Sequence, residues 1–310
     1  MDEHVPESYC FYPSAPETSE TDGLRSAFEA AEKSGAGGAH NAWIMKPSDG
    51  CKGHHIQVQN NLDEMLAFLE SREKGSISYV VQRYIERPLL LHGGRKFDMR
   101  YWVLLDGRYN GYLYKDGVCR TSSVPFSMDD LGDRFVHLSN HCIQEEHEDY
   151  GVYEPTNEMF FEEFSKWLDA EHGDGAFAEK IVPQVTMLVR ETLLASKEKM
   201  FTVEHADYRA FNVFGYDFLV DADLKVWLLE VNSSPAVAED LLQQFTKDLV
   251  ELAVDPFFPV DESQLTPSKA GADTTDECRF ELVLGADEGP QVDFGFEDTP
   301  KKGHGQANKK

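Results

Sequence analysis

Three oxygen-bearing side chains near the end of the central region are spaced to suit a divalent cation. In "FGYDFLVDADLKVWLLEVNSSPA", Asp217 precedes a turn and Glu230 and Asn232 follow it. A turn of two or four residues centred between Asp223 and Leu224 would place Asp217 opposite Glu230, with Asn232 one pleat further on the same face. Two carboxylates so close repel each other unless a cation joins them, and magnesium prefers oxygen ligands. The hairpin predicts a magnesium site, with a solvated acidic face as the alternative.

The second arm of this hairpin also predicts a packed face. Trp227, Leu229 and Val231 alternate with the two polar residues. Side chains point alternately to the two faces of a strand. We therefore expect these three apolar side chains to face the core and the oxygen donors to face away from it.

A second strand adds positive charge. In "RKFDMRYWVLL", Lys96, Asp98 and Arg100 alternate with apolar residues and share one face. Arg120 follows on a neighbouring strand after an Asp-Gly turn. Fixed cations beside a metal site are what phosphoryl transfer requires, so the two strands favour a nucleoside triphosphate site. Ion pairing of the arginines with nearby acids is the alternative.

A glycine-bearing loop supplies a third element. In "WIMKPSDGCKGHHI", Lys46 ends a strand and Lys52 follows in the loop between Gly50 and Gly53. Backbone amides of such a loop, together with a lysine, can bind phosphates. The signal is weak by itself, because neither G-x-x-x-x-G-K-[ST] nor G-x-G-x-x-G occurs.

Alternating strands and helices must position these residues. The pattern predicts a mixed α/β fold in which antiparallel strands are flanked by helices. The first helix of the central region starts at Asn61, whose side chain is a plausible cap. Asp-Gly pairs predict an antiparallel meander over residues 95–123, and the last hairpin spans residues 211–232. Helices are expected over 157–170, 179–197 and 235–254.

Composition limits the class of protein. The 310 residues are 41% hydrophobic and carry a net charge of −27, which disfavours binding to nucleic acid or anionic lipid. No signal peptide or membrane-spanning run is recognisable, so a cytoplasmic location is expected. The five scattered cysteines are expected to be free thiols. We expect a flexible segment over 1–41, one folded domain of two subdomains over 42–259 and an acidic flexible tail over 260–310.

Several motifs in fixed order resemble the tubulin-tyrosine ligase family of ATP-grasp ligases. They are "PESYCFYP", "WIMKPSDGCKGHHI", "VVQRYIERPLLLHGGRKFDMRYWVLL", "YLYKDGVCRTSS", "HLSNHCIQ", "NEMFFEEF" and the hairpin quoted above. The resemblance implies an ATP-grasp fold with the nucleotide between two subdomains. In that family a further domain precedes the "PESY" region and helps hold tubulin, whereas here a few residues precede it.

The resemblance also implies roles for individual residues. Lys46, Lys52 and Lys96 would lie at the ATP phosphates, Gln82 at the adenine, and Asp98 and Asn140 beside the nucleotide. Arg100 and Arg120 would stabilise the transferred phosphate. Asp217, Glu230 and Asn232 would bind Mg²⁺, in agreement with the strand-face argument. His55 stands where the family has a glycine.

The activity implied by the resemblance is peptide-bond formation on tubulin. ATP would phosphorylate the C-terminal carboxylate of α-tubulin, and free tyrosine would attack the acyl phosphate. The alternatives are addition of glutamate or glycine, a pseudoenzyme that binds nucleotide and tubulin without turnover, and an ATP-grasp ligase that joins small metabolites, which the motif set disfavours. A microtubule-associated location would follow from tubulin as partner.

Overall fold

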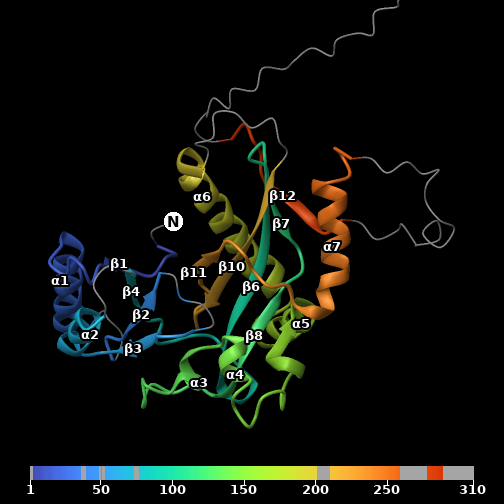
Figure 1. Ribbon diagram of the computed structural model, residues 1–310. Coiled ribbons are helices and arrows are strands. Elements are labelled where there is room, and N and C mark those ends of the chain that lie inside the picture. The colour runs from blue at the N-terminus through green and yellow to red at the C-terminus, as the bar shows by residue number, and fades with distance from the viewer. Residues whose placement is uncertain are drawn as a thin grey trace, which may run out of the picture.

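The computed structural model describes residues 3–35, 40–48, 50, 53–72, 77–200, 210–258 and 278–288. Two antiparallel sheets with their helices form a small and a large lobe, side by side (Figure 1). The predicted mixed α/β fold of antiparallel sheets flanked by helices is thus confirmed. None of the helices in the described part of the chain combines the length and apolar character needed to cross a membrane.

The small lobe is a sheet of order β1-β4-β2-β3 covered on one face by two helices. Its elements are β1 (Ser8–Phe11), α1 (Ser19–Ser34), β2 (Trp43–Pro47), β3 (Gln57–Gln59), α2 (Leu62–Glu70) and β4 (Tyr79–Arg83). Trp43 and Met45 pack against the helices, so Ile44 and Lys46 point to the other face, toward the large lobe. The predicted cap is confirmed, since the Asn61 side chain accepts from the Glu64 amide.

The expectation of a flexible segment over residues 1–41 is wrong for most of its length. β1 pairs with β4 from Ser8↔Gln82 to Phe11↔Tyr79. Helix α1 buries Leu24 and Phe28 in the core of the small lobe. Glycines and polar residues around α1 hid this amphipathic helix, whose apolar residues are few but regularly spaced.

The large lobe is an eight-stranded sheet with helices on both faces. Its strands are β5 (Leu90–Leu91), β6 (Arg95–Asp106), β7 (Gly111–Tyr114), β8 (Val118–Pro125), β9 (Glu158–Phe160), β10 (Phe211–Val220), β11 (Val226–Asn232) and β12 (Phe280–Leu284). Its helices are α3 (Arg134–His137), α4 (His141–Gln144), α5 (Phe161–His172), α6 (Val182–Met200) and α7 (Glu239–Ala253), with 3-10 turns at His92–Gly94 and Pro155–Asn157 and a π-helical turn at Ala176–Ile181.

The two faces of the long strand β6 have different partners. Phe97, Met99 and the following odd-numbered residues pack under α5 and α6 in the main core. On the other face, Trp102 packs with Phe245 of α7. The N-terminal half of that face carries the predicted charged residues Lys96, Asp98 and Arg100. The predicted division of this strand into an apolar and a charged face is confirmed.

The predicted meander is only half right. β7 pairs with the C-terminal half of β6, as expected, but β8 pairs with the N-terminal half of β6 instead of with β7. The outer edge of β7 is occupied by β12 from the C-terminal region. Because β8 lies beside β6, Arg120 stands directly opposite Asp98.

β12 also corrects the expected flexible tail over residues 260–310, in which it forms an ordered strand. It is fastened to the lobe by an ion pair of Arg279 with Asp116 and by packing of Phe280 on Tyr114. Lys197 on α6 donates to the carbonyls of Ala286 and Glu288. Residues 259–277 and 289–310 lie outside the described part of the chain.

Candidate active site

A charged cluster forms where β6, β8 and β10 run side by side. Asp217 on β10 faces Arg100 on β6, and Asp98 on β6 faces Arg120 on β8. The Arg100 Nη2 atom lies 2.9 Å from Asp217 Oδ2, and Arg120 Nη2 lies 2.8 Å from the same oxygen. Arg120 Nε lies 2.7 Å from Asp98 Oδ1. Four predicted site residues therefore form one network, so the ion-pairing interpretation holds in this state.

This network shifts the ionisation of its members. Burial by itself would raise the pKa of Asp217, but Arg120 and Arg100 more than offset this, and the pKa is lowered. Burial disfavours charge on Arg120, yet Asp217 and Asp98 raise its pKa. Both acids are almost fully buried. The cluster is thus a set of fixed charges in a protected environment, where they act strongly on any phosphate brought near.

The predicted metal ligands share one face because of a β-bulge. The last paired residues of the hairpin are Val220 and Val226, so an odd number of residues lies between them and not the predicted two or four. The register then shifts between Phe218↔Leu228 and Asp217↔Glu230. The extra residue turns Glu230 to the face of Asp217, where strict alternation would have sent it to the core.

The same bulge explains why the predicted packed face of β11 is wrong. Val226 and Leu228 are the residues of this strand that enter the main core. Trp227 and Leu229 are half-buried, and Val231 is exposed. The prediction assumed that side chains alternate between the two faces along the whole strand. The bulge between Leu228 and Glu230 breaks this alternation, so the residues before Glu230 face the opposite way from the prediction.

The donor set fits a hard divalent cation. Asn232 Nδ2 lies 3.0 Å from Glu230 Oε1, and Asp217 faces Glu230 across the strands. Loss of surrounding water and the nearby charge of Asp217 raise the pKa of Glu230. A cation would relieve this repulsion, and two carboxylates with an amide oxygen are donors that magnesium accepts. Among the described residues no group of three His, Cys, Asp or Glu side chains is arranged for a metal, so the amide would be needed.

Two lysines face this cluster from opposite sides of the cleft between the lobes: Lys46 is half-buried and Lys96 is buried. Lys46 Nζ on β2 lies 2.9 Å from Gln82 Oε1 on β4. Lys96 Nζ on β6 lies 2.8 Å from the Tyr84 hydroxyl oxygen. Burial lowers the pKa of Lys46, and it lowers the pKa of Lys96 to about 7. An anion between the lysines would favour their charged forms.

A small cavity lies between the lobes beside these lysines. It has a volume of about 40 Å³ and is lined by Ile44, Lys46, Gln82, Arg83, Tyr84, Ile85, Lys96, Leu219 and Leu229. It has room for about one water molecule. A nucleobase would enter only if the lobes moved apart, and it would then meet apolar side chains from both sheets.

The loop after β2 approaches the large lobe from the small one. A Cβ atom on Gly53 would lie 3.2 Å from Asn140 Oδ1, so the loop backbone lies against the predicted Asn140. His55 has φ of 61°, the left-handed conformation that a glycine adopts without strain. Lys52 lies outside the described residues.

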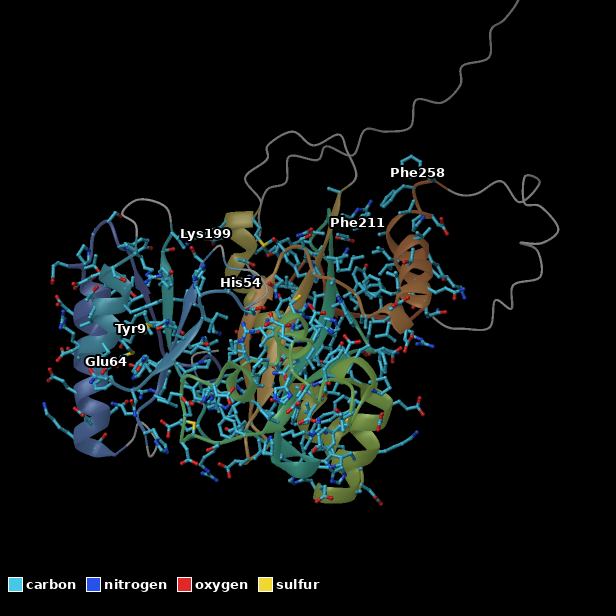
Figure 2. The ribbon with its side chains drawn as sticks, turned by 60° about the horizontal axis from the view of Figure 1, so that its bottom comes forward. Tyr9, His54, Glu64, Lys199, Phe211 and Phe258 are labelled. Atoms are coloured by element: carbon cyan, nitrogen blue, oxygen red, sulfur yellow. The ribbon has the colours of Figure 1, made fainter. Side chains whose placement is uncertain are left out.

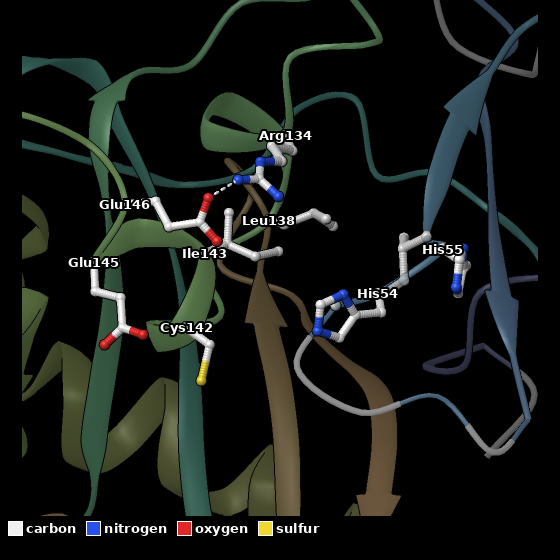
Figure 3. A pocket seen from close by; sticks show the side chains of 10 residues that line it. His54, His55, Arg134, Leu138, Cys142, Ile143, Glu145 and Glu146 are labelled. Atoms are coloured by element: carbon white, nitrogen blue, oxygen red, sulfur yellow. Dashed lines mark hydrogen bonds and ion pairs between the residues drawn. The ribbon is translucent and has the colours of Figure 1, made fainter.

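A larger cavity of about 320 Å³ opens between this loop and α4. His54 points into it from the loop, and Cys142, Glu145 and Glu146 line the opposite wall (Figure 3). Figure 2 shows His54 between the two lobes. It shares no lining residue with the small cavity beside the lysines.

Three contributors to the site are not predicted from the sequence. The Ser139 hydroxyl donates to Asp98, and Tyr84 and His137 hold Lys96. Gln144 fixes the segment that carries Ser139, because its amide donates to the Leu138 carbonyl, 2.6 Å away. Ser139 adjoins Asn140 in "HLSNHCIQ", so the motif itself was the available signal.

Comparison with known proteins gives a consistent result. The family model described as "Tubulin-tyrosine ligase family" matches residues 5–265. Tubulin glycylase 3B of Tetrahymena thermophila is 31% identical over 226 residues, which are 70% of this chain and 18% of the relative. A probable tubulin polyglutamylase of Bos taurus is 38% identical over 162 residues, 52% of this chain and 34% of the relative. A tubulin monoglycylase of Danio rerio is 34% identical over 210 residues, 65% of this chain and 26% of the relative. The matched part of the chain thus spans 18% to 34% of the length of these curated relatives.

Proposed function

This chain belongs to the tubulin-tyrosine ligase family, and from that premise we propose that it is an ATP-dependent ligase that joins the amine of an amino acid to a carboxylate of tubulin. The observation that carries the proposal is the pairing of Asp217 with Glu230 on the face that also presents Arg100 and Arg120. This face lies across a cleft from Lys46, so oxygen donors and cations surround one space.

The reaction divides into two balanced steps. The γ-phosphoryl group of ATP passes to an acceptor carboxylate, which forms an acyl phosphate and releases ADP. The amine of the amino acid then attacks the acyl carbon, inorganic phosphate leaves, and the amine loses a proton. Negative charge develops on the phosphoryl oxygens during the first step, and Arg100 and Arg120 stabilise it.

The remaining residues bind and orient. Lys46 and Lys96 hold the phosphates, Gln82 borders the base, and Asn140 meets the phosphate loop at Gly53. Asp98 orients Arg120 through their ion pair. Asp217, Glu230 and Asn232 hold Mg²⁺, which neutralises phosphate charge when it is bound.

The identity of the added amino acid is a finer proposal. Two of the relatives reported above carry glycylase in their names and one carries polyglutamylase, which supports glycine or glutamate as the donor. Tyrosine, predicted from the sequence motifs, stays a prediction. The three donors differ in side chain but share the amine that attacks.

A labelled-donor assay tests the proposal. Tubulin, ATP and magnesium are incubated with radiolabelled glycine, glutamate or tyrosine and with wild type or the Asn232→Ala variant. We expect incorporation of at least one donor by the wild type and at least a hundredfold less by the variant. Equal background for all three donors would refute the ligase and leave the pseudoenzyme alternative.

A further inference from the structure

The Lys96 ammonium is held by two acceptors inside the protein. Its Nζ atom lies 2.8 Å from the Tyr84 hydroxyl oxygen and 2.8 Å from the backbone carbonyl of His137. An ammonium has three N–H donors. No third acceptor is recorded for it among the described residues, and Lys96 lines the small cavity between the lobes. One N–H is therefore left for a ligand in the cleft.

The Tyr84 hydroxyl is in turn fixed by His137. The His137 Nε2 atom lies 3.0 Å from the Asp130 carbonyl oxygen, which can only accept, so Nε2 carries a proton. Burial lowers the pKa of His137, which keeps the ring neutral and leaves Nδ1 as an acceptor. Nδ1 lies 2.9 Å from the Tyr84 oxygen, so Tyr84 donates to it.

The hydrogen bonds therefore run in one direction. Lys96 donates to Tyr84, Tyr84 donates to His137, and His137 donates to the Asp130 carbonyl. The His137 ring is further enclosed by edge contacts with Tyr84 and Phe126. The direction of these hydrogen bonds cannot reverse while the His137 ring stays neutral, because the Asp130 carbonyl can only accept. The Tyr84 oxygen therefore keeps its lone pairs directed at Lys96.

We propose that Tyr84 and His137 are positioning residues for nucleotide binding: they hold the Lys96 side chain so that its free N–H meets a phosphate of the bound nucleotide. The inference rests on the nucleotide site of the proposed function, and it adds that Lys96 takes up a proton when the nucleotide binds. The charged groups that face Lys96 are Asp98 on its own strand and Lys46 across the cleft. Asp130 and Asp133 are the acids that act on His137.

The pH dependence of nucleotide binding follows from the protonation of Lys96 in the unliganded protein. Burial lowers the pKa of Lys96 to about 7, opposed by Asp98 and reinforced by Lys46. At pH 7 about half of the unliganded molecules carry a neutral amine, so binding of a phosphate takes up about half a proton. Above pH 7 the affinity contributed by Lys96 falls about tenfold per pH unit.

Calorimetric titration with MgADP at pH 6, 7 and 8.5, in two buffers of different ionisation enthalpy, tests the inference. Tyr84→Phe removes the acceptor that supports the charged amine. We expect it to weaken binding about tenfold at pH 7 and to move the fall in affinity to lower pH. Tyr101→Phe is the matched control, because Tyr101 is a buried tyrosine on the core face of β6 whose hydroxyl has no partner among the described residues.

Two further variants separate positioning from folding. His137→Asn keeps an acceptor near the Nδ1 position and should retain most of the wild-type affinity and pH profile, whereas His137→Leu should behave like Tyr84→Phe. Lys96→Met cannot take up a proton at position 96. Any proton uptake that this variant still shows comes from the nucleotide itself, and the difference from the wild type is the uptake by Lys96. Superimposable pH profiles of Tyr84→Phe and Tyr101→Phe would overturn the inference while leaving the nucleotide site intact. Failure of the wild type to bind MgADP at any pH would overturn both.

Discussion

Asp217 is the residue at which the charges of the cleft meet. It accepts from Arg100 and Arg120 and faces Glu230 across the hairpin. Removing one partner from such a buried network leaves the other charges uncompensated. Its energetic role in the fold and its proposed role as a metal ligand therefore depend on the same carboxylate.

Asp217→Asn tests the energetic role. We expect the variant to lose about 3 kcal/mol of unfolding free energy at pH 7, measured by urea denaturation. The folded-state pKa of Asp217 is lowered, so its contribution is present above the unfolded value near 4 and is lost as pH falls through the folded value. The wild type should thus lose more stability than the variant between pH 5 and pH 2.5.

Glu162→Gln is the control for this prediction. Glu162 pairs with Lys166 on the exposed surface of α5, 2.6 Å away, and its loss should leave the unfolding free energy nearly unchanged. Parallel stability curves for wild type and Asp217→Asn from pH 7 to pH 2.5 would contradict the assigned ion pairs.

His55 presents a second test at the scale of one residue. Its backbone is left-handed, with φ of 61°, which costs an L-residue about 1 kcal/mol. His55→Gly should therefore be about 1 kcal/mol more stable than His55→Ala, because both lose the imidazole and only glycine relieves the backbone. Thermal unfolding of the two variants measures the difference, and a less stable glycine variant would exclude the strain.

At the scale of elements, local alternation predicted more than strand pairing did. The charged and apolar faces of β6 followed from its sequence, because charged and apolar residues alternate from Lys96 to Tyr101. The facing of Asp217 and Glu230 was also predicted, but it arises from an odd loop and a bulge that compensate. Nothing in "VWLLEVN" marks the bulge, because either register of the strand would turn a leucine toward the core, Leu228 in one and Leu229 in the other. β8 was expected to pair with β7, but that edge is taken by β12, which lies far along the chain, and β8 pairs with β6.

Helix α1 gives the prediction that belongs to this scale. Deleting residues 1–35 removes β1 and α1 and uncovers apolar side chains that Leu24 and Phe28 now cover. At about 1.5–3 kcal/mol for each large side chain, the loss should be about 5 kcal/mol. Urea denaturation measures it. An unchanged transition would restore the interpretation of this segment as flexible.

At the scale of the whole molecule, the cleft joins residues from distant parts of the chain. Lys46 comes from the small lobe, Arg120 from the middle of the large sheet, and Glu230 from its edge. The lobes meet through apolar contacts among Ile44, Tyr84 and Leu138. The cavity at the lysines is too small for a nucleobase, so we expect nucleotide binding to open the lobes. The net charge of −27 disfavours phosphate binding over the surface as a whole, whereas Lys46, Lys96, Arg100 and Arg120 gather at this cleft.

The most direct test of the cleft is a titration of Mn²⁺, a paramagnetic substitute for Mg²⁺, in the presence of ADP, with the free ion followed by electron paramagnetic resonance. The wild type should bind Mn²⁺ at least tenfold more tightly than Glu230→Gln or Asn232→Ala, while both variants keep the wild-type melting temperature within a few degrees. If all three proteins bind Mn²⁺ with equal affinity, the two strands do not form the metal site, and the proposed catalytic arrangement is wrong.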